Sequence, residues 1–277
     1  MLSSRKVYKL YLHASPIPCK GVGMETQSDP LASFVSHRIP HVSASSCNLW
    51  AAAPALWVLK YLYNYKDTVG AAAHRGTASE AGIAHGLLTG AALKDCVDKA
   101  EAHFDLLTST LASMADGRRE KERAAIAGIV QQGLDALRQY GPPSAMQRKI
   151  EHTVPGLPPF IGYLDFEWPG IVVDLKTQMA LAGSVRASHA RQLALYVAGT
   201  NSQARVLYAT PKKSAVYIVE EAHAHMAALV NIACSLGRFL GVSPDRAVLA
   251  GLISADVESF YYSDPAIRQA AFEIFGV

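Results

Sequence analysis

The chain has 277 residues, of which 50% are hydrophobic, so it can bury a sizeable core in one large domain or two small ones. Its formal net charge is only +3, which excludes a histone-like binder and leaves any contact with nucleic acid to a local basic patch. The opening stretch MLSSRKVYKLYLHASPIPCKG is too short and too polar for a membrane span or a secretory signal, so no export is expected.

The first 40 residues show the weakest structural pattern. We expect residues 1–40 to form an N-terminal arm that is disordered or lies on the surface. We expect residues 41–277 to fold as a single domain, because no repeat or low-complexity linker interrupts them. A serine-capped helix is predicted soon after His41, and a second helical segment begins at Pro54.

A longer helix is predicted for AAAHRGTASEAGIAHGLLTG, entered through residues 75–77. It carries two side chains suited to a functional site, Glu80 and His85, which lie five residues apart and do not share a face position. Glycines at 76, 82 and 86 lower the helix propensity of this stretch. They predict close packing against another element or a close approach of the backbone to a ligand.

Helical patterns continue to a stop at residues 141–143, with a break near residues 116–117. Residues 146–154 then alternate in the manner of a strand. Residues 160–178, FIGYLDFEWPGIVVDLKTQ, predict a β-hairpin, because two apolar runs rich in β-branched and aromatic residues flank the turn Pro169-Gly170. These three strands are expected to form an antiparallel meander.

The second run of this hairpin places charged side chains in a strand that otherwise reads as buried. Alternation puts Asp174 and Lys176 on one face and Val173 and Leu175 on the other. Pairing across the turn brings Asp165 near Asp174. Two carboxylates and the Leu175 carbonyl form a set of hard oxygens that Mg²⁺ or Mn²⁺ prefers. A salt-bridged structural hairpin is the alternative interpretation, because a buried unpaired ion is costly.

A further helix is predicted from about residue 187. Gln192 and Tyr196 lie four residues apart and therefore share one face of it, with His189 on the same face. An amphipathic helix that carries a polar pair is the alternative.

The remaining elements complete an α/β (α+β) fold. Residues 204–210 and 214–220 predict two strands, followed by a long helix over 220–240 and a last one that begins at Pro265. We expect a central mixed β-sheet flanked by helices, with a helical N-terminal half. The chain contains neither G-x-G-x-x-G after its first strand nor a Walker A motif, which argues against a nucleotide-binding Rossmann or P-loop fold.

In chain order, Glu80, Asp165, Asp174-Leu175-Lys176 and Gln192-x-x-x-Tyr196 resemble the motifs of the PD-(D/E)XK nuclease superfamily, in its RecB-like, phage-type exonuclease branch. The run R-G-x-A-x-E that ends at Glu80 looks like the first motif of that branch, and the ending SFYYSDP is similar to endings in phage members. The resemblance spans residue 41 to the C-terminus and implies a restriction-endonuclease-like core.

The resemblance implies metal-assisted hydrolysis of phosphodiester bonds by Mg²⁺ or Mn²⁺. Its implied ligands are Glu80, Asp165, Asp174 and the backbone carbonyl of Leu175, with His85 as the second choice to Glu80. Many relatives carry a histidine in the first motif.

The implied catalytic residues are Asp165, Asp174, Lys176, Gln192 and Tyr196. Lys176 would act on the attacking water or on the charge that develops at the phosphate, and the sequence leaves both roles open. The glutamine and tyrosine would orient the lysine and the DNA backbone.

An iron–sulfur cluster, which some RecB-like nucleases bind, is not expected. The cysteines are scattered at 19, 47, 96 and 234, without a C-terminal group. The implied protein is a deoxyribonuclease, most simply an exonuclease of recombination or repair, in the cytoplasm of a bacterium or a phage-infected host. Its expected partners are DNA and a single-strand annealing or ssDNA-binding protein, without a membrane. The alternative is a non-catalytic DNA-binding or assembly protein that retains the fold.

Overall fold

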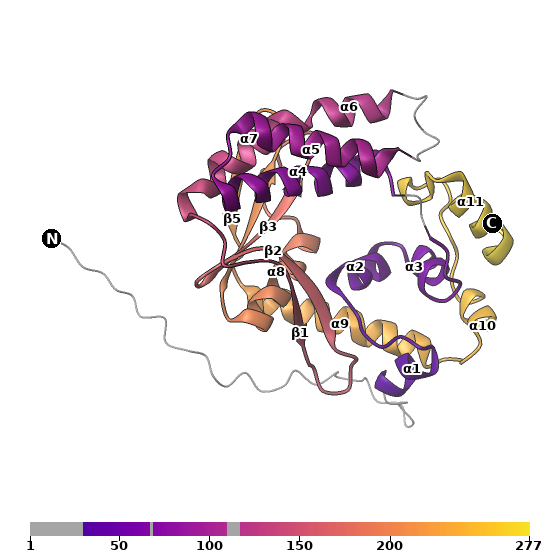
Figure 1. Ribbon diagram of the computed structural model, residues 1–277. Coiled ribbons are helices and arrows are strands. Elements are labelled where there is room, and N and C mark those ends of the chain that lie inside the picture. Colours follow the sequence, from indigo (N-terminus) through magenta and orange to yellow (C-terminus); the bar gives the residue numbers. More distant parts are fainter. Residues whose placement is uncertain (1–29, 67–68, 110–116) are drawn as a thin grey trace.

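The computed structural model describes residues 30–66, 69–109 and 117–277 (Figure 1). Most of the predicted arm, residues 1–29, lies outside the described residues, as does residue 116 of the helix break predicted near residues 116–117. Residues 30–40, which were also assigned to the arm, differ from the prediction. Helix α1 (Pro30–Ser36) buries Phe34 completely in a core cluster shared with α9 (Ala222–Leu240), so this segment is packed.

Five strands form one mixed sheet in the described part of the chain, in the spatial order β1-β2-β3-β4-β5. Their bounds are β1 (Ala145–His152), β2 (Phe160–Trp168), β3 (Ile171–Thr177), β4 (Gln203–Ala209) and β5 (Ser214–Ile218). The first three strands pair antiparallel, β3 pairs parallel with β4, and β4 pairs antiparallel with β5. The predicted meander and the predicted mixed sheet are therefore both confirmed.

The hairpin β2–β3 turns at Pro169-Gly170, where Gly170 adopts a positive φ of 77° that a side chain would disfavour. Its ladder pairs Trp168 with Ile171 and ends at Phe166 opposite Val173. Beyond that pair the two strands separate, while β3 continues to pair with β4 through Thr177. Asp165, Asp174 and Lys176 lie in this separated part.

One face of the sheet is covered by helices from the N-terminal half (Figure 1). Helices α4 (Ala71–Thr89) and α7 (Ile126–Leu137) contact the strands, and α5 (Leu93–Thr108) and α6 (Arg118–Ala124) pack on these two helices. A 3₁₀ turn follows α7 at Arg138–Tyr140. Phe166, Val173 and Leu175 of the sheet share a buried core cluster with Ile83 and Ile129 of these helices. The predicted orientation of Val173 and Leu175 is confirmed, because both belong to this cluster.

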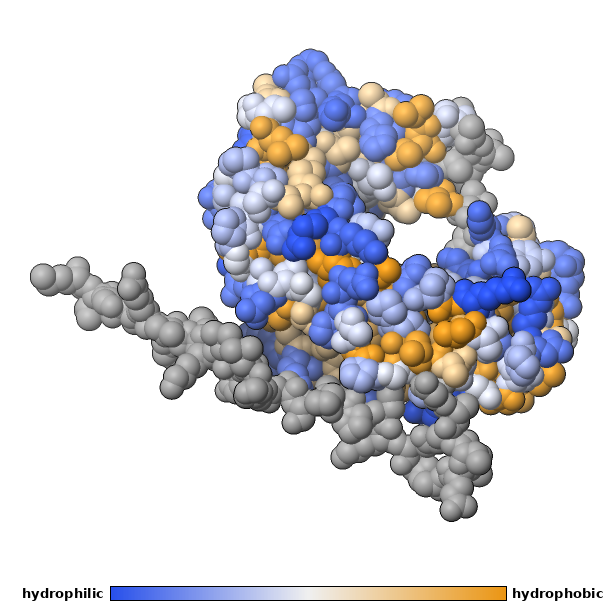
Figure 2. Space-filling model, turned by 60° about the horizontal axis from the view of Figure 1, so that its bottom comes forward, coloured by the Kyte–Doolittle hydropathy of each residue, from blue (hydrophilic) through white to orange (hydrophobic). Residues whose placement is uncertain are grey.

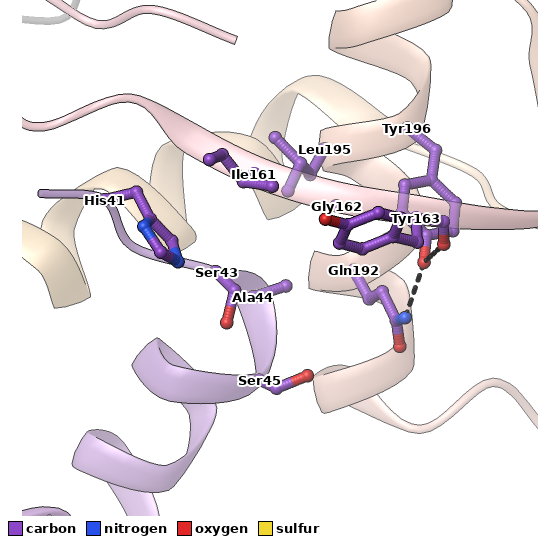
Figure 3. Close-up of a pocket in the computed structure, with 10 residues that line it drawn as sticks. All are labelled: His41, Ser43, Ala44, Ser45, Ile161, Gly162, Tyr163, Gln192, Leu195 and Tyr196. Atoms are coloured by element: carbon purple, nitrogen blue, oxygen red, sulfur yellow. Dashed lines mark hydrogen bonds between the residues drawn. The ribbon is translucent and has the colours of Figure 1, made fainter. Parts of the chain in front are cut away.

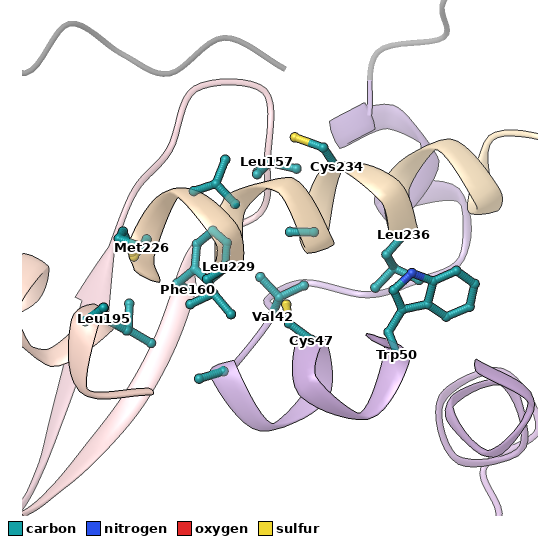
Figure 4. Packing of buried hydrophobic residues seen from close by; sticks show 14 of the residues in the cluster. Val42, Cys47, Trp50, Leu157, Phe160, Leu195, Met226, Leu229, Cys234 and Leu236 are labelled. Carbon is teal, nitrogen blue, oxygen red and sulfur yellow. The ribbon is translucent and has the colours of Figure 1, made fainter. Parts of the chain in front are cut away.

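The opposite face packs against α8 (Ala187–Thr200), α9 (Ala222–Leu240) and α2 (Ala44–Ala52). Figure 4 shows Phe160 between these elements, with Cys47 and Trp50 on α2 and Leu229 on α9. Ser43 caps α2 by accepting a hydrogen bond from the Ser46 backbone N–H, as the sequence predicts.

A smaller cluster joins α3 (Pro54–Tyr61) to the end of the chain. The C-terminal elements are α10 (Arg246–Ala250), a 3₁₀ turn at Phe260–Tyr262, and α11 (Pro265–Phe275). Asp264 caps α11 directly before Pro265, which confirms the predicted start of the last helix. In the space-filling view, hydrophilic residues gather beside a hollow in the molecule (Figure 2). Within the described residues, no helix combines the length and the apolarity needed to cross a bilayer.

Helix α4 begins earlier than predicted. It starts at Ala71, and Arg75 lies inside it, 4% exposed, with an ion pair to Glu122 and a hydrogen bond to the Thr177 carbonyl. The predicted close packing at its glycines is confirmed. A Cβ on Gly82 would lie 2.5 Å from the Cys96 carbonyl oxygen, so α4 and α5 touch through their backbones.

Candidate functional site

The predicted polar residues converge where β2 and β3 separate. Asp174 and Lys176 lie on β3, Asp165 on β2, Glu80 on α4, and Gln192 and Tyr196 on α8. One hairpin and two helices, one on each side of it in the sequence, therefore contribute to one cluster.

Asp174 and Lys176 form a buried ion pair, with 2.7 Å between Asp174 Oδ2 and Lys176 Nζ. The Asp174 side chain is 1% exposed and that of Lys176 is 26% exposed. Burial lowers the pKa of Lys176, but the charges of Asp174 and Asp165 outweigh it and raise the pKa above its usual value. Lys176 is therefore an ammonium ion at neutral pH.

Asp165 lies beside this pair and replaces a missing backbone partner. Its Oδ2 accepts a hydrogen bond of 2.7 Å from the Leu175 backbone N–H, which lies past the end of the β2–β3 ladder. Burial raises the pKa of Asp165 well above its usual value, and the negative charges of Asp174 and Glu80 raise it further.

Glu80 reaches the cluster from α4 through Gln147 of β1. Gln147 Nε2 donates to Glu80 Oε1 at 2.5 Å and to Asp165 Oδ1 at 3.3 Å. Burial raises the pKa of Glu80, the Gln147 hydrogen bond opposes this, and the Asp174 charge adds to the rise. Glu80 and Asp165 are thus close enough that the charge of Glu80 raises the pKa of Asp165.

For His85, the second choice to Glu80, no side-chain hydrogen bond or ion pair is found among the described residues. Its backbone carbonyl accepts a hydrogen bond from the Thr89 hydroxyl at 2.7 Å, as in an ordinary helix end. The geometry brings Glu80 to the carboxylates and gives no such contact for His85. The roles of both residues stay predictions.

Gln192 and Tyr196 lie on the shared helix face that their spacing predicts. Gln192 Nε2 donates to Tyr196 Oη at 2.6 Å, and Tyr196 Oη donates to the Tyr163 carbonyl at 2.7 Å. The same hydroxyl lies 3.4 Å from Asp174 Oδ1. Burial first, and then the charges of Asp174 and Asp165, raise the pKa of Tyr196, which stays a neutral phenol.

Both residues also line a pocket of 340 Å³ between α8, β2 and the start of α2 (Figure 3). Its lining includes polar side chains from each side, and the full set is His41, Ser43, Ala44, Ser45, Ile161, Gly162, Tyr163, Gln192, Leu195 and Tyr196. The hydrogen-bonded pair therefore borders an accessible space, and Tyr196 links the lining of that space to Asp174.

His189, on the same helix, contacts β4, the strand that pairs with the Lys176 part of β3. Its Nδ1 lies 2.7 Å from Tyr208 Oη, and Tyr208 is the β4 residue paired with Lys176. Burial, followed by the positive charge of Lys176, lowers the pKa of His189 to about 4. The imidazole is therefore neutral at neutral pH.

Sequence reasoning did not assign a role to Gln147 or Tyr208. Gln147 alternates with Lys149 and Glu151 on a predicted strand, which gives no sign that its amide meets two carboxylates. Tyr208 lies in an apolar run that reads as core. Its register opposite Lys176, which depends on the parallel β3–β4 pairing, is a tertiary feature.

The donors of this cluster suit a hard divalent cation in their chemistry. Glu80 and Asp165 have pKa values raised in part by neighbouring negative charge, and Asp174 Oδ2 is buried without a hydrogen bond, balanced by the Lys176 ammonium. A cation would relieve both conditions. As they stand, no three His, Cys, Asp or Glu side chains of the described part are spaced to hold a metal ion.

The mixed five-stranded sheet with helices on both faces defines a fold of the α/β class. Comparison with solved structures finds a protein of similar fold. The chain is similar to a crystal structure described as a "putative exonuclease" from Eubacterium rectale, with a TM-score of 0.52 and 14% identity. The match covers 87% of this chain and 93% of that one, and it supports the fold.

A second structure, of SSO0001, has 19% identity over 58% of this chain and 84% of its own, and its TM-score of 0.31 carries no weight. No protein-family model matches the sequence, and a search of curated proteins finds no significant match.

Proposed function

We propose that the protein is a Mg²⁺- or Mn²⁺-dependent deoxyribonuclease of the PD-(D/E)XK type, in the RecB-like branch, and that it acts as an exonuclease in DNA recombination or repair. One observation carries the proposal. Glu80 and Asp165, bridged by Gln147, lie near the ion pair of Asp174 with the partly buried Lys176 ammonium. The hydrogen-bonded pair Gln192 and Tyr196 adjoins Asp174. The fold shared with the "putative exonuclease" supports it.

The divalent cation, when bound, would activate a water molecule and neutralise charge on the scissile phosphate. Glu80, Asp165 and Asp174 would hold it, together with the Leu175 carbonyl. Grouping so many negative charges in a half-buried site without a cation is unfavourable, as the raised pKa values of Glu80 and Asp165 indicate.

Lys176 contributes positive charge. Because its pKa is raised, it is a poor general base at neutral pH and is suited to stabilising charge on a phosphate oxygen. This favours the second of the two roles that the sequence left open. Asp174 fixes the ammonium by the 2.7 Å ion pair.

Gln192 and Tyr196 position the acidic side of the site. The Tyr196 hydroxyl is held by Gln192 and by the Tyr163 carbonyl, 3.4 Å from Asp174 Oδ1. Both side chains line the neighbouring pocket (Figure 3), from which a DNA backbone would approach.

The alternative, a non-catalytic DNA-binding protein that retains the fold, is favoured by one observation, the spacing of the acidic groups, which is not that of a metal site in the described residues. An assay with end-labelled linear DNA and closed circular DNA, with Mg²⁺ and with a chelator, discriminates the two. Chelator-sensitive loss of linear DNA alone supports an exonuclease, and cleavage of the circle makes it an endonuclease. Binding without cleavage under every condition supports the alternative.

A further inference from the structure

Gln147 has an unusual backbone conformation for a strand residue. Its φ is 47°, in the left-handed region, although it lies inside β1 between Met146, which pairs with Phe166, and Arg148, which pairs with Leu164. A glutamine rarely adopts this conformation, and such residues persist where the surroundings enforce them.

The strained backbone directs the side chain toward the acidic cluster. The β1–β2 pairs on either side of it place Gln147 across from Asp165. Its Nε2 lies 2.5 Å from Glu80 Oε1 and 3.3 Å from Asp165 Oδ1. A primary amide carries two N–H groups, so one nitrogen serves both carboxylates. The partial positive charge of this N–H₂ group therefore lies between two negative groups, where a cation would be most stabilised.

We propose that Gln147 occludes the cation position between Glu80 and Asp165, and that a divalent cation binds there only after displacing the amide. The inference rests on the proposed function, because it deepens the account of that same site. Gln147 is a positioning residue that holds the two carboxylates together until the cation arrives. Its exposure to solvent leaves the side chain free to swing out without disturbing the core.

The occlusion accounts for the spacing of the acidic groups. Glu80 and Asp165 are both engaged by the Gln147 amide, and Asp174 is engaged by Lys176. Each carboxylate is thus satisfied by a nitrogen donor, and no three acidic groups of the described residues converge on one point. Release of the amide frees one oxygen on each of two carboxylates.

The test is a titration of the full-length, metal-free protein with Mn²⁺. The electron paramagnetic resonance signal of the free ion, recorded at each addition, gives the Mn²⁺ dissociation constant. Gln147→Gly removes the amide and accepts the positive φ. Gln147→Asn also tolerates that φ, but its amide is one methylene too short to bridge the carboxylates. Both variants are expected to bind Mn²⁺ about tenfold more tightly than the wild type, because no charge-assisted hydrogen bond must be broken first.

Asn64→Gly is the matched control, because Asn64 also has a positive φ, of 59°, on a loop after α3. It relieves similar strain and is expected to leave the Mn²⁺ dissociation constant unchanged. A general effect of chain stability would move all three variants together. If Gln147→Gly does not fold, Gln147→Asn alone decides the result.

Two failures are distinguishable. Mn²⁺ binding by the wild type with equal or lower affinity in both Gln147 variants overturns the occlusion and leaves the proposed function intact. Absence of Mn²⁺ binding in the wild type and in every variant, together with absence of DNA cleavage, overturns the proposed function and the occlusion with it.

Discussion

The two halves of β3 differ in how their backbone and side chains are satisfied. From Ile171 to Val173 the strand is paired on both sides, and its side chains enter the two core clusters. From Asp174 onward β2 has separated, and the Asp165 carboxylate accepts the Leu175 N–H in place of a strand partner. The comparison shows that ending a ladder early creates a place where charged groups are useful, because an unpaired buried N–H needs an acceptor.

The largest effect on DNA cleavage is expected in the separated half of β3, from Asp174 onward. Lys176→Ala leaves Asp174 buried without its cationic partner, so it should abolish DNA cleavage and cost about 3 kcal/mol of unfolding free energy. Cleavage of labelled DNA and urea denaturation measure the two effects. Asp174→Asn should also abolish cleavage.

Lys149→Ala is the control for that experiment. Lys149 pairs with Glu151 at 3.6 Å on the surface, with both side chains about half exposed, so its loss should cost under about 1 kcal/mol. Cleavage at the wild-type rate by Lys176→Ala would contradict the assignment of this half of the strand to catalysis.

The paired half is tested by Phe166→Ala. Phe166 is fully buried and is the last β2 residue paired with β3, so its truncation should cost about 3–5 kcal/mol of unfolding free energy. Phe166 points into the core cluster between the sheet and helices α4 and α7, so the protein that remains folded should retain its Mn²⁺ affinity. A large loss of affinity in folded protein would show that the two halves of β3 are not separable.

Local sequence patterns were sufficient for the hairpin itself and for the alternation of side chains along β3. The hairpin, its Pro169-Gly170 turn and the alternation of Asp174 and Lys176 against Val173 and Leu175 follow from strand periodicity alone. The Gln192 and Tyr196 contact likewise follows from helical spacing.

The separated half was only partly predictable. The Asp165 carboxylate replaces a ladder partner, and the left-handed Gln147 bridges two strands and a helix, so both depend on tertiary pairing that no local pattern encodes. Arg75 was predicted at a helix entrance and lies buried inside α4, because its ion pair with Glu122 of α6 offsets the burial.

A smaller effect is expected for the helix that approaches the separated half. Glu80→Gln should lower cleavage about 10- to 100-fold, as loss of one group that holds a metal does, and His85→Ala should change it less than about threefold. Steady-state cleavage rates at saturating Mg²⁺ measure both. The opposite ranking would move the first-motif role to His85.

The smallest effect concerns Asp165 and pH. The folded-state pKa of Asp165 is above its unfolded value, so its contribution to stability is complete below the unfolded pKa and is lost as pH rises through the folded pKa. Asp165→Asn should therefore stabilise the metal-free protein by about 1 kcal/mol at pH 7. The gain should vanish near pH 3, where both variants are uncharged at this position. Denaturation at the two pH values measures this gain in stability. An Asp165→Asn variant that is less stable than the wild type at pH 7 would contradict the raised pKa of Asp165.

The contact between α4 and α5 has a consequence for how far from the chemistry a substitution can act. Gly82 lies two residues after Glu80 on α4, and a methyl group on it would collide with the Cys96 carbonyl of α5. The position of Glu80 therefore depends on the close backbone contact between α4 and α5. We expect Gly82→Ala to tilt α4 and to displace the Glu80 carboxylate, so the tolerance of the proposed site to mutation would be limited by a position outside that site.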